Sequence, residues 1–233
     1  MIEPVKRTPS QLPLELRLEP RYGREDFLVS PSNELAFNFF EAWPQWPGNM
    51  VLLAGPAGSG KSHLGAIWAT RAQACVLSAA SLPLADIPVI ASAKAVLLED
   101  ADEVASAESQ LFHLINLLRE KGGCLAMTAR KLPDLWNVKT PDLLSRLRLA
   151  TAIEISAPDD ALVRAVLVKL FLDRQLTIDT SLIEFLAMRI ERSLDAARRI
   201  VDRLDREALA QGRAITRPMA AQVLAAMEAG ENG

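Results

Sequence analysis

Residues 49–64 decide the fold of this chain, and their sequence is Asn-Met-Val-Leu-Leu-Ala-Gly-Pro-Ala-Gly-Ser-Gly-Lys-Ser-His-Leu. The apolar run from Met50 to Ala54 predicts a short buried strand. The eight residues that follow match the phosphate-loop pattern G-x-x-x-x-G-K-[ST], and a helical stretch comes after them, as that motif requires. The sequence therefore predicts a P-loop α/β fold that binds the phosphates of a nucleotide.

The residue types in this loop suit phosphate chemistry. Glycines let backbone N–H groups approach phosphate oxygens, because no Cβ blocks them. Lys61 is expected to reach the β- and γ-phosphates, and the Ser62 hydroxyl is expected to ligate Mg²⁺. The helix beginning near Lys61 directs its positive dipole end at the same anion. We expect ADP or ATP with Mg²⁺ to contact Gly55, Pro56, Ala57, Gly58, Ser59, Gly60, Lys61 and Ser62.

Size and composition restrict the class of protein. The chain has 233 residues, half of them hydrophobic, which is enough for one α/β domain and a smaller module. The net charge of −3 argues against sequence-independent DNA binding, which needs clustered cations. Cys75 and Cys124 fit core packing in a reducing cytosol. No apolar run is long enough to cross a membrane and the first ten residues do not resemble a secretory signal, so we expect a cytoplasmic protein.

A second chemical site is predicted where another apolar run ends. Residues 95–100, Ala-Val-Leu-Leu-Glu-Asp, are typical of a Walker B strand, in which one carboxylate (Glu99) holds Mg²⁺ and the next (Asp100) orients the attacking water. The alternative is a strand that ends in a solvent-facing acidic pair. Thr128 ends the apolar run 123–128, at the strand end where ligands bind, and is expected to face the γ-phosphate. Its alternative role is in a cap or turn.

The remaining pattern indicates a parallel five-stranded sheet flanked by helices, followed by helices alone. Further strands are predicted at 74–79 and 152–155, the first of them buried, and helices at 34–43, 61–72, 105–121 and 141–149. After Ala157 we predict helices at 159–175, 180–191, 193–211 and 217–228, with N-caps at Asp159, Thr180, Ser193 and Thr216. The expected organisation is a tail (1–20), a nucleotide-binding base (21–156) and a helical module (157–233).

The tail contains Gln11-Leu12-Pro13-Leu14-Glu15-Leu16, in which three leucines alternate with other residues. Alternation puts the leucines on one side of an extended segment. Two interpretations follow from the residues: a strand added to the core, or a short peptide that inserts leucines into an apolar groove of a partner.

Several segments together resemble the AAA+ ATPases of the DnaA clade, and most closely its Hda branch of regulatory inactivators. Residues 27–36 are similar to the segment of that clade near the adenine, and the phosphate loop is similar down to the trailing His63 and Leu64, which adds His63 to the expected cofactor contacts. Leu144-Ser145-Arg146-Leu147 resembles box VII, and residues 213–216 resemble the start of the last lid helix. The resemblance covers roughly residues 11–228.

The resemblance implies a regulator of replication initiation. Residues 11–16 resemble the clamp-binding motif of Hda, so Gln11, Leu12, Leu14 and Leu16 are expected to bind the sliding clamp (the β subunit of DNA polymerase III). Arg146 is expected to be an arginine finger that stimulates ATP hydrolysis on DnaA. The chain ends near residue 233, before the helix-turn-helix domain of DnaA, so we expect no direct sequence-specific DNA binding. Assembly into a homo-oligomer is a further possibility. The alternatives are a helicase-loader ATPase and a DnaA-like initiator without its DNA-binding domain.

Three departures from the clade pattern concern the γ-phosphate. Glu99 stands where the metal-binding Asp is usual, Ala129 and Arg130 replace a small polar residue and Asp, and Asp195 aligns with the sensor 2 arginine. Arg192, Arg198 and Arg199 are the candidates to replace that arginine, with no choice among them. We therefore expect weak or absent intrinsic ATPase activity.

Overall fold

The computed structural model describes residues 22–231, so the predicted clamp motif at residues 11–16 lies outside the described part. Its centre is a parallel sheet of five strands in the order β2-β3-β4-β1-β5, which confirms the predicted fold class. The strands are β1 (Met50–Ala54), β2 (Cys75–Ser78), β3 (Ala95–Glu99), β4 (Cys124–Ala129) and β5 (Thr151–Glu154).

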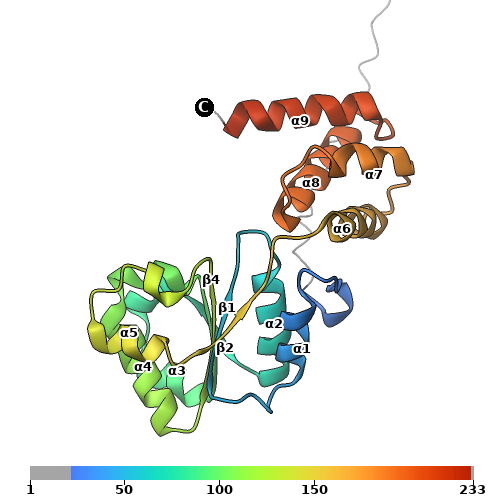
Figure 1. The fold of residues 1–233 in the computed structure, drawn as a ribbon. Coiled ribbons are helices and arrows are strands. Elements are labelled where there is room, and N and C mark those ends of the chain that lie inside the picture. Colours follow the sequence, from blue (N-terminus) through green and yellow to red (C-terminus); the bar gives the residue numbers. More distant parts are fainter. Residues whose placement is uncertain (1–21, 232–233) are drawn as a thin grey trace, which may run out of the picture.

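Helices cover both faces of the sheet (Figure 1). On one side lie α1 (Glu34–Glu41) and α2 (Lys61–Ala72); on the other lie α3 (Ile87–Ile90), α4 (Glu108–Glu120) and α5 (Pro141–Leu147). Short 3₁₀ helices occur at Arg24–Asp26, Ala79–Leu84, Ala91–Ala93, Ala101–Ser106 and Pro133–Leu135. Burial on both faces explains why the strands are apolar runs: Leu52 packs with the α4 side and Leu53 with the α1 and α2 side.

A separate helical part, called the lid below, follows β5 and lies beyond one end of the sheet (Figure 1). It consists of α6 (Asp160–Asp173), α7 (Thr180–Ala187), α8 (Leu194–Gln211) and α9 (Arg217–Glu231). Leu167, Phe171 and Leu204 belong to its own apolar core. Within residues 22–231, no helix has the length and apolar character needed to span a membrane.

Helix caps in the lid agree with the predicted ones at Asp159 and Ser193. Asp159 Oδ1 accepts a hydrogen bond of 2.8 Å from the Leu162 backbone N–H, and Ser193 Oγ accepts one of 3.3 Å from Ala196. The Thr180 cap was wrong, because Asp179 caps α7 by accepting from the Ser181 N–H at 2.7 Å.

Two strand predictions need correction. The run 74–79 was predicted as a buried strand, but β2 is the edge of the sheet and Val76 is 55% exposed. Asp100 was included in the strand 95–100, but β3 ends at Glu99 and Asp100 has the left-handed backbone angle φ of +53°. That turn redirects the chain at the point where the two carboxylates stand.

Candidate functional site

The phosphate loop connects β1 to α2 at the carboxyl edge of the sheet. Gly58 and Gly60 have φ angles of +67° and +99°, which L-residues rarely adopt. Gly60 is the N-cap of α2 and provides no side-chain cap, so the first-turn N–H groups of that helix receive no such partner. This backbone therefore offers uncapped donors at a positive helix end, an arrangement suited to an anion.

Lys61 is held within the loop. Its Nζ donates hydrogen bonds to the carbonyl oxygens of Gly55 at 2.8 Å and Pro56 at 2.7 Å. Burial lowers the pKa of Lys61 below its usual value, while the carboxylates of Asp100 and Asp102 oppose that shift. The structure thus puts the predicted phosphate-binding cation at the loop, bonded to loop carbonyls.

Three predicted site residues are brought together next to Lys61. The Ser62 hydroxyl donates to Glu99 Oε2 at 3.1 Å, and the Thr128 hydroxyl donates to the same oxygen at 2.5 Å. Thr128 is buried, whereas Glu99 is partly exposed. One carboxylate oxygen therefore connects the phosphate loop, the end of β3 and the end of β4.

Asp100 lies beside this cluster on an exposed turn. Its backbone N–H donates to Thr128 Oγ1 at 3.1 Å, so the threonine fixes the turn as well as Glu99. Together with Ser62 and Glu99, Asp100 lines an open groove of about 620 Å³. Arg130, the residue that departs from the clade pattern, forms an ion pair of 3.7 Å with Glu103.

His63 lies on the other side of the loop helix. Its Nε2 is 3.0 Å from the Gly23 carbonyl oxygen, and the rings of Tyr22 and Phe27 contact its ring edge-to-face. Burial lowers the pKa of His63, so the neutral form is favoured. A cavity of about 180 Å³ between base and lid is lined by His63, Phe27, Leu28, Asn33, Leu194 and Arg198, among others.

The lid touches the phosphate loop directly. The Leu194 N–H, at the start of α8, donates to the Gly58 carbonyl oxygen at 2.8 Å. A Cβ atom on Gly58 would come within 1.9 Å of Ser193 Oγ. Glycine at position 58 is therefore required both by its backbone angle and by the approach of the lid.

The sequence could not choose among three lid arginines, and the structure distinguishes them. Arg192 pairs with Asp160 at 2.9 Å, on the exposed surface. Arg198 lines the cavity between base and lid, pairs with Asp195 at 3.3 Å and lies 5.9 Å from the Tyr22 ring centre. Arg199 is exposed and does not line that cavity. Arg198 is thus the arginine of the three that faces the cavity.

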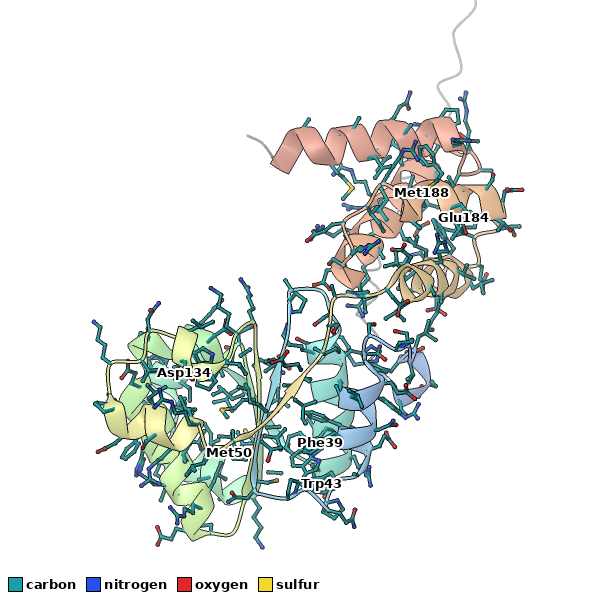
Figure 2. All side chains as sticks on the ribbon, viewed as in Figure 1. Phe39, Trp43, Met50, Asp134, Glu184 and Met188 are labelled. Atoms are coloured by element: carbon teal, nitrogen blue, oxygen red, sulfur yellow. The ribbon has the colours of Figure 1, made fainter. Side chains whose placement is uncertain are left out.

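Arg146 lies near the amino ends of the strands, opposite to the carboxyl ends where the phosphate loop is. It lines a cavity of about 250 Å³ together with Met50, the first residue of β1, and Leu125, the second residue of β4. Figure 2 labels Met50, which lies farther from the lid than does the loop after β1. The Arg146 guanidinium lies 4.9 Å from the centre of the Phe112 ring and pairs with no carboxylate among residues 22–231, including Asp142.

Sequence reasoning missed two features of these sites. Arg119, in the last turn of α4, shares the Arg146 cavity, and no motif marks it. The contact of Ser193 and Leu194 with Gly58 depends on how the lid packs, which no local pattern encodes. The only usable signal for the latter was the helix cap at Ser193.

Comparison with known proteins shows which sequences the chain resembles. A family model described as the Hda lid domain matches residues 160–224. DnaA, the chromosomal replication initiator protein, of Thermomicrobium roseum is 27% identical over 206 residues, which cover 76% of this chain and 43% of DnaA. An uncharacterized protein of Haemophilus influenzae is 26% identical, covering 92% of this chain and 98% of its own length. The chain thus spans less than half the length of that DnaA relative.

Solved structures show the same fold. Domain III of Thermotoga maritima DnaA superposes with a TM-score of 0.74 at 18% identity, covering 88% of this chain and 96% of that one. AMPPCP-bound DnaA from Aquifex aeolicus gives a TM-score of 0.66 at 19% identity, covering 81% and 66%. The fold is that of an AAA+ nucleotide-binding domain with its helical lid. In sequence the chain is similar to DnaA, and its helical part is similar to the Hda lid domain.

Proposed function

We propose that this chain is a cytoplasmic, nucleotide-binding regulator of chromosomal replication initiation. It binds the sliding clamp through residues 11–16 and stimulates ATP hydrolysis on DnaA through Arg146. The observation that carries the proposal is the position of Arg146, on the edge of the sheet opposite to the chain's own phosphate loop. A cation in that position is suited to a neighbour's nucleotide.

The loop fits ADP or ATP with Mg²⁺. The glycine backbone and uncapped start of α2 suit phosphate oxygens, and Lys61 supplies a cation. Ser62 and Glu99, already joined by a hydrogen bond, offer the hydroxyl and carboxylate oxygens that Mg²⁺ prefers. When bound, Mg²⁺ would neutralise phosphate charge. The cavity lined by Phe27, His63 and Arg198 would hold the base end of the nucleotide.

Weak intrinsic hydrolysis is consistent with the same contacts. Glu99 Oε2 is already an acceptor for two hydroxyl groups, those of Ser62 and Thr128. Arg130 pairs with Glu103, and Asp195 pairs with Arg198. The two hydrogen bonds and the two ion pairs thus occupy the polar groups at the three positions where the clade pattern is broken. We propose that bound nucleotide acts on the conformation of this chain, while turnover takes place on the partner.

Distance supports action in trans. Met50 and Ala54 are four residues apart, about 13 Å along β1 at the usual rise of a strand. Arg146 is beside Met50, while the phosphate loop begins just after Ala54. A finger acts by neutralising charge that develops on the transferred phosphoryl group of the neighbouring subunit, and such fingers contribute on the order of 10³–10⁵ in rate.

The test is Arg146→Ala in a DnaA hydrolysis assay on clamp-loaded DNA. We expect stimulation to fall at least a hundredfold while the variant keeps its melting temperature, its own ADP affinity and its clamp binding. Arg148→Ala, on the same helical segment but paired with Asp134, is the matched control and should stimulate normally. Full stimulation by Arg146→Ala would refute the finger. Loss of the variant's own nucleotide would favour a helicase-loader ATPase.

Clamp binding is tested separately by deleting residues 1–18. We expect the truncated chain to lose the sliding clamp in size-exclusion chromatography while it still binds ADP. A synthetic peptide of residues 9–18 should compete with the full chain for the clamp, because an extended segment offers alternate side chains to pockets. If the peptide does not bind and the deletion unfolds the domain, residues 11–16 belong to the core instead.

A further inference from the structure

Arg119 and Arg146 lie on one surface formed by α4 and α5. On α4, Phe112, Ile115 and Arg119 follow each other at spacings of three and four residues, which puts them on one helix face. Arg146 of α5 stacks on Phe112, the first residue of that series, at 4.9 Å from the ring centre. The two helices therefore present both guanidinium groups on the same side of the molecule.

Both arginines line the cavity of about 250 Å³ at the amino ends of β1 and β4. Its other walls include the apolar side chains of Met50, Ile115 and Leu125. Among the residues that the structure describes, Arg119 and Arg146 are the charged ones lining this cavity. The surface thus combines an apolar recess with two cations.

Neither cation has an acidic partner within residues 22–231, whereas Arg148 and Arg130 on the same domain pair with Asp134 and Glu103. Arg119 is exposed and Arg146 is half-buried, so the two guanidinium groups give one accessible cavity a local excess of positive charge. An anion brought to the cavity would neutralise that excess charge. Guanidinium groups match phosphate oxygens in geometry as well as in charge.

We propose that Arg119 is a second arginine for the partner's nucleotide, acting beside Arg146 on the phosphates bound at the phosphate loop of the neighbouring AAA+ subunit. This inference rests on the proposed function. Arg146, which stacks on Phe112, contacts the transferred phosphoryl group. Arg119 is more exposed and brings a second positive charge to the same triphosphate. The pair distinguishes a partner carrying ATP from one carrying ADP by the extra phosphate charge.

The experiment compares Arg119→Ala, Arg119→Lys and Arg146→Ala with the control Arg148→Ala, all in the full chain with clamp-loaded DNA and DnaA. Single-turnover hydrolysis of DnaA-bound ATP is measured at saturating regulator. We expect Arg119→Ala to slow hydrolysis at least tenfold and Arg119→Lys to restore part of that loss. A second readout is binding to DnaA loaded with AMPPCP or with ADP. The wild type should prefer the AMPPCP form, and Arg119→Ala should lose most of that preference.

A structural role for Arg119 predicts a different pattern. As a cation in the last turn of α4 it also complements the helix dipole, so its removal could lower the melting temperature slightly. In that case Arg119→Lys would behave as wild type, and nucleotide preference would not change. If Arg119→Ala matches Arg148→Ala in both readouts while Arg146→Ala is inactive, Arg119 has no such role and the inference is wrong. If Arg146→Ala is fully active, the proposed function itself fails.

Discussion

The Ser62 hydroxyl donates a hydrogen bond of 3.1 Å to Glu99 Oε2, which joins the phosphate loop to the end of β3. These residues are 37 positions apart in the chain. They meet because β1 and β3 are parallel strands of one sheet, so the segments after them emerge at the same edge. Glu99 stands where the clade usually has aspartate, and this hydrogen bond shows that the glutamate carboxylate reaches the loop hydroxyl.

Replacing Glu99 by Gln should therefore separate metal binding from folding. The amide oxygen can still accept the hydroxyl hydrogen bonds of Ser62 and Thr128, so we expect the melting temperature without nucleotide to change little. The charge is lost, so the gain in ATP affinity caused by Mg²⁺ should drop at least tenfold. Calorimetric titrations with and without Mg²⁺ measure this, with Glu120→Gln, an exposed glutamate on α4, as control. An unchanged Mg²⁺ effect would exclude Glu99 as a metal ligand.

Lys61→Ala should weaken ADP binding at least tenfold, about 1.4 kcal/mol. The variant removes the loop cation and leaves the carbonyl groups of Gly55 and Pro56 without its hydrogen bonds. Isothermal calorimetry with ADP measures the effect, and Lys121→Ala, an exposed lysine, is the control. Equal affinity in Lys61→Ala and wild type would mean that this lysine does not contact phosphate.

The lid contact is tested by comparing two glycines that share a left-handed backbone. Gly58 and Gly212 have φ angles of +67° and +59°, but only Gly58 faces another side chain, that of Ser193. Both glycine-to-alanine variants should lose about 1 kcal/mol of stability through backbone strain. Only Gly58→Ala should also raise the Kd for ADP, by tenfold or more. Similar ADP affinity in the two variants would show that nucleotide binding does not depend on the lid contact.

Asp159 predicts a dependence of lid stability on pH. The Leu162 N–H donates to the carboxylate and lowers the pKa of Asp159 in the folded state. The cap is therefore fully stabilising above the unfolded pKa, about 3.9, and loses its effect as pH falls through the lower folded pKa. At pH 7 Asp159→Ala should cost about 1 kcal/mol of unfolding free energy, and that cost should shrink in acid.

Ser193→Ala is the control for this titration, since its hydroxyl caps α8 without ionising. Urea denaturation at several pH values gives the unfolding free energies. The Ser193→Ala cost should remain constant over the acidic range, whereas the Asp159→Ala cost should decline. Parallel behaviour of the two variants would assign the pH effect to groups other than Asp159.

The sequence predicted much of the base because its strands are continuous apolar runs and its phosphate loop has a fixed context. The helix predicted at 61–72 has those bounds, since the motif defines its start. The buried position predicted for β2 was wrong because an apolar run is the same at the centre and at the edge of a sheet. The order of strands decides exposure, and Val76 lies on the edge.

The candidate site was predictable where motifs supply the residues and unpredictable where packing does. Ser62, Glu99 and Thr128 meet as the strand order requires. Arg198 could not be chosen over its neighbours, because α8 carries arginines on several faces and only the docking of the lid selects one. Arg119 carries no motif at all; its interest comes from the cavity that it shares with Arg146.

The hydrogen bond from the Leu194 N–H to Gly58 has a mechanical consequence. It joins the first residue of α8 to the phosphate loop, and the whole helix has 18 residues. At 1.5 Å per residue α8 is about 27 Å long, so a tilt of about 5° at the loop would displace its far end by about 2 Å. A small rotation of α8 about its contact with the phosphate loop is thus amplified into a larger displacement at the far end of the helix.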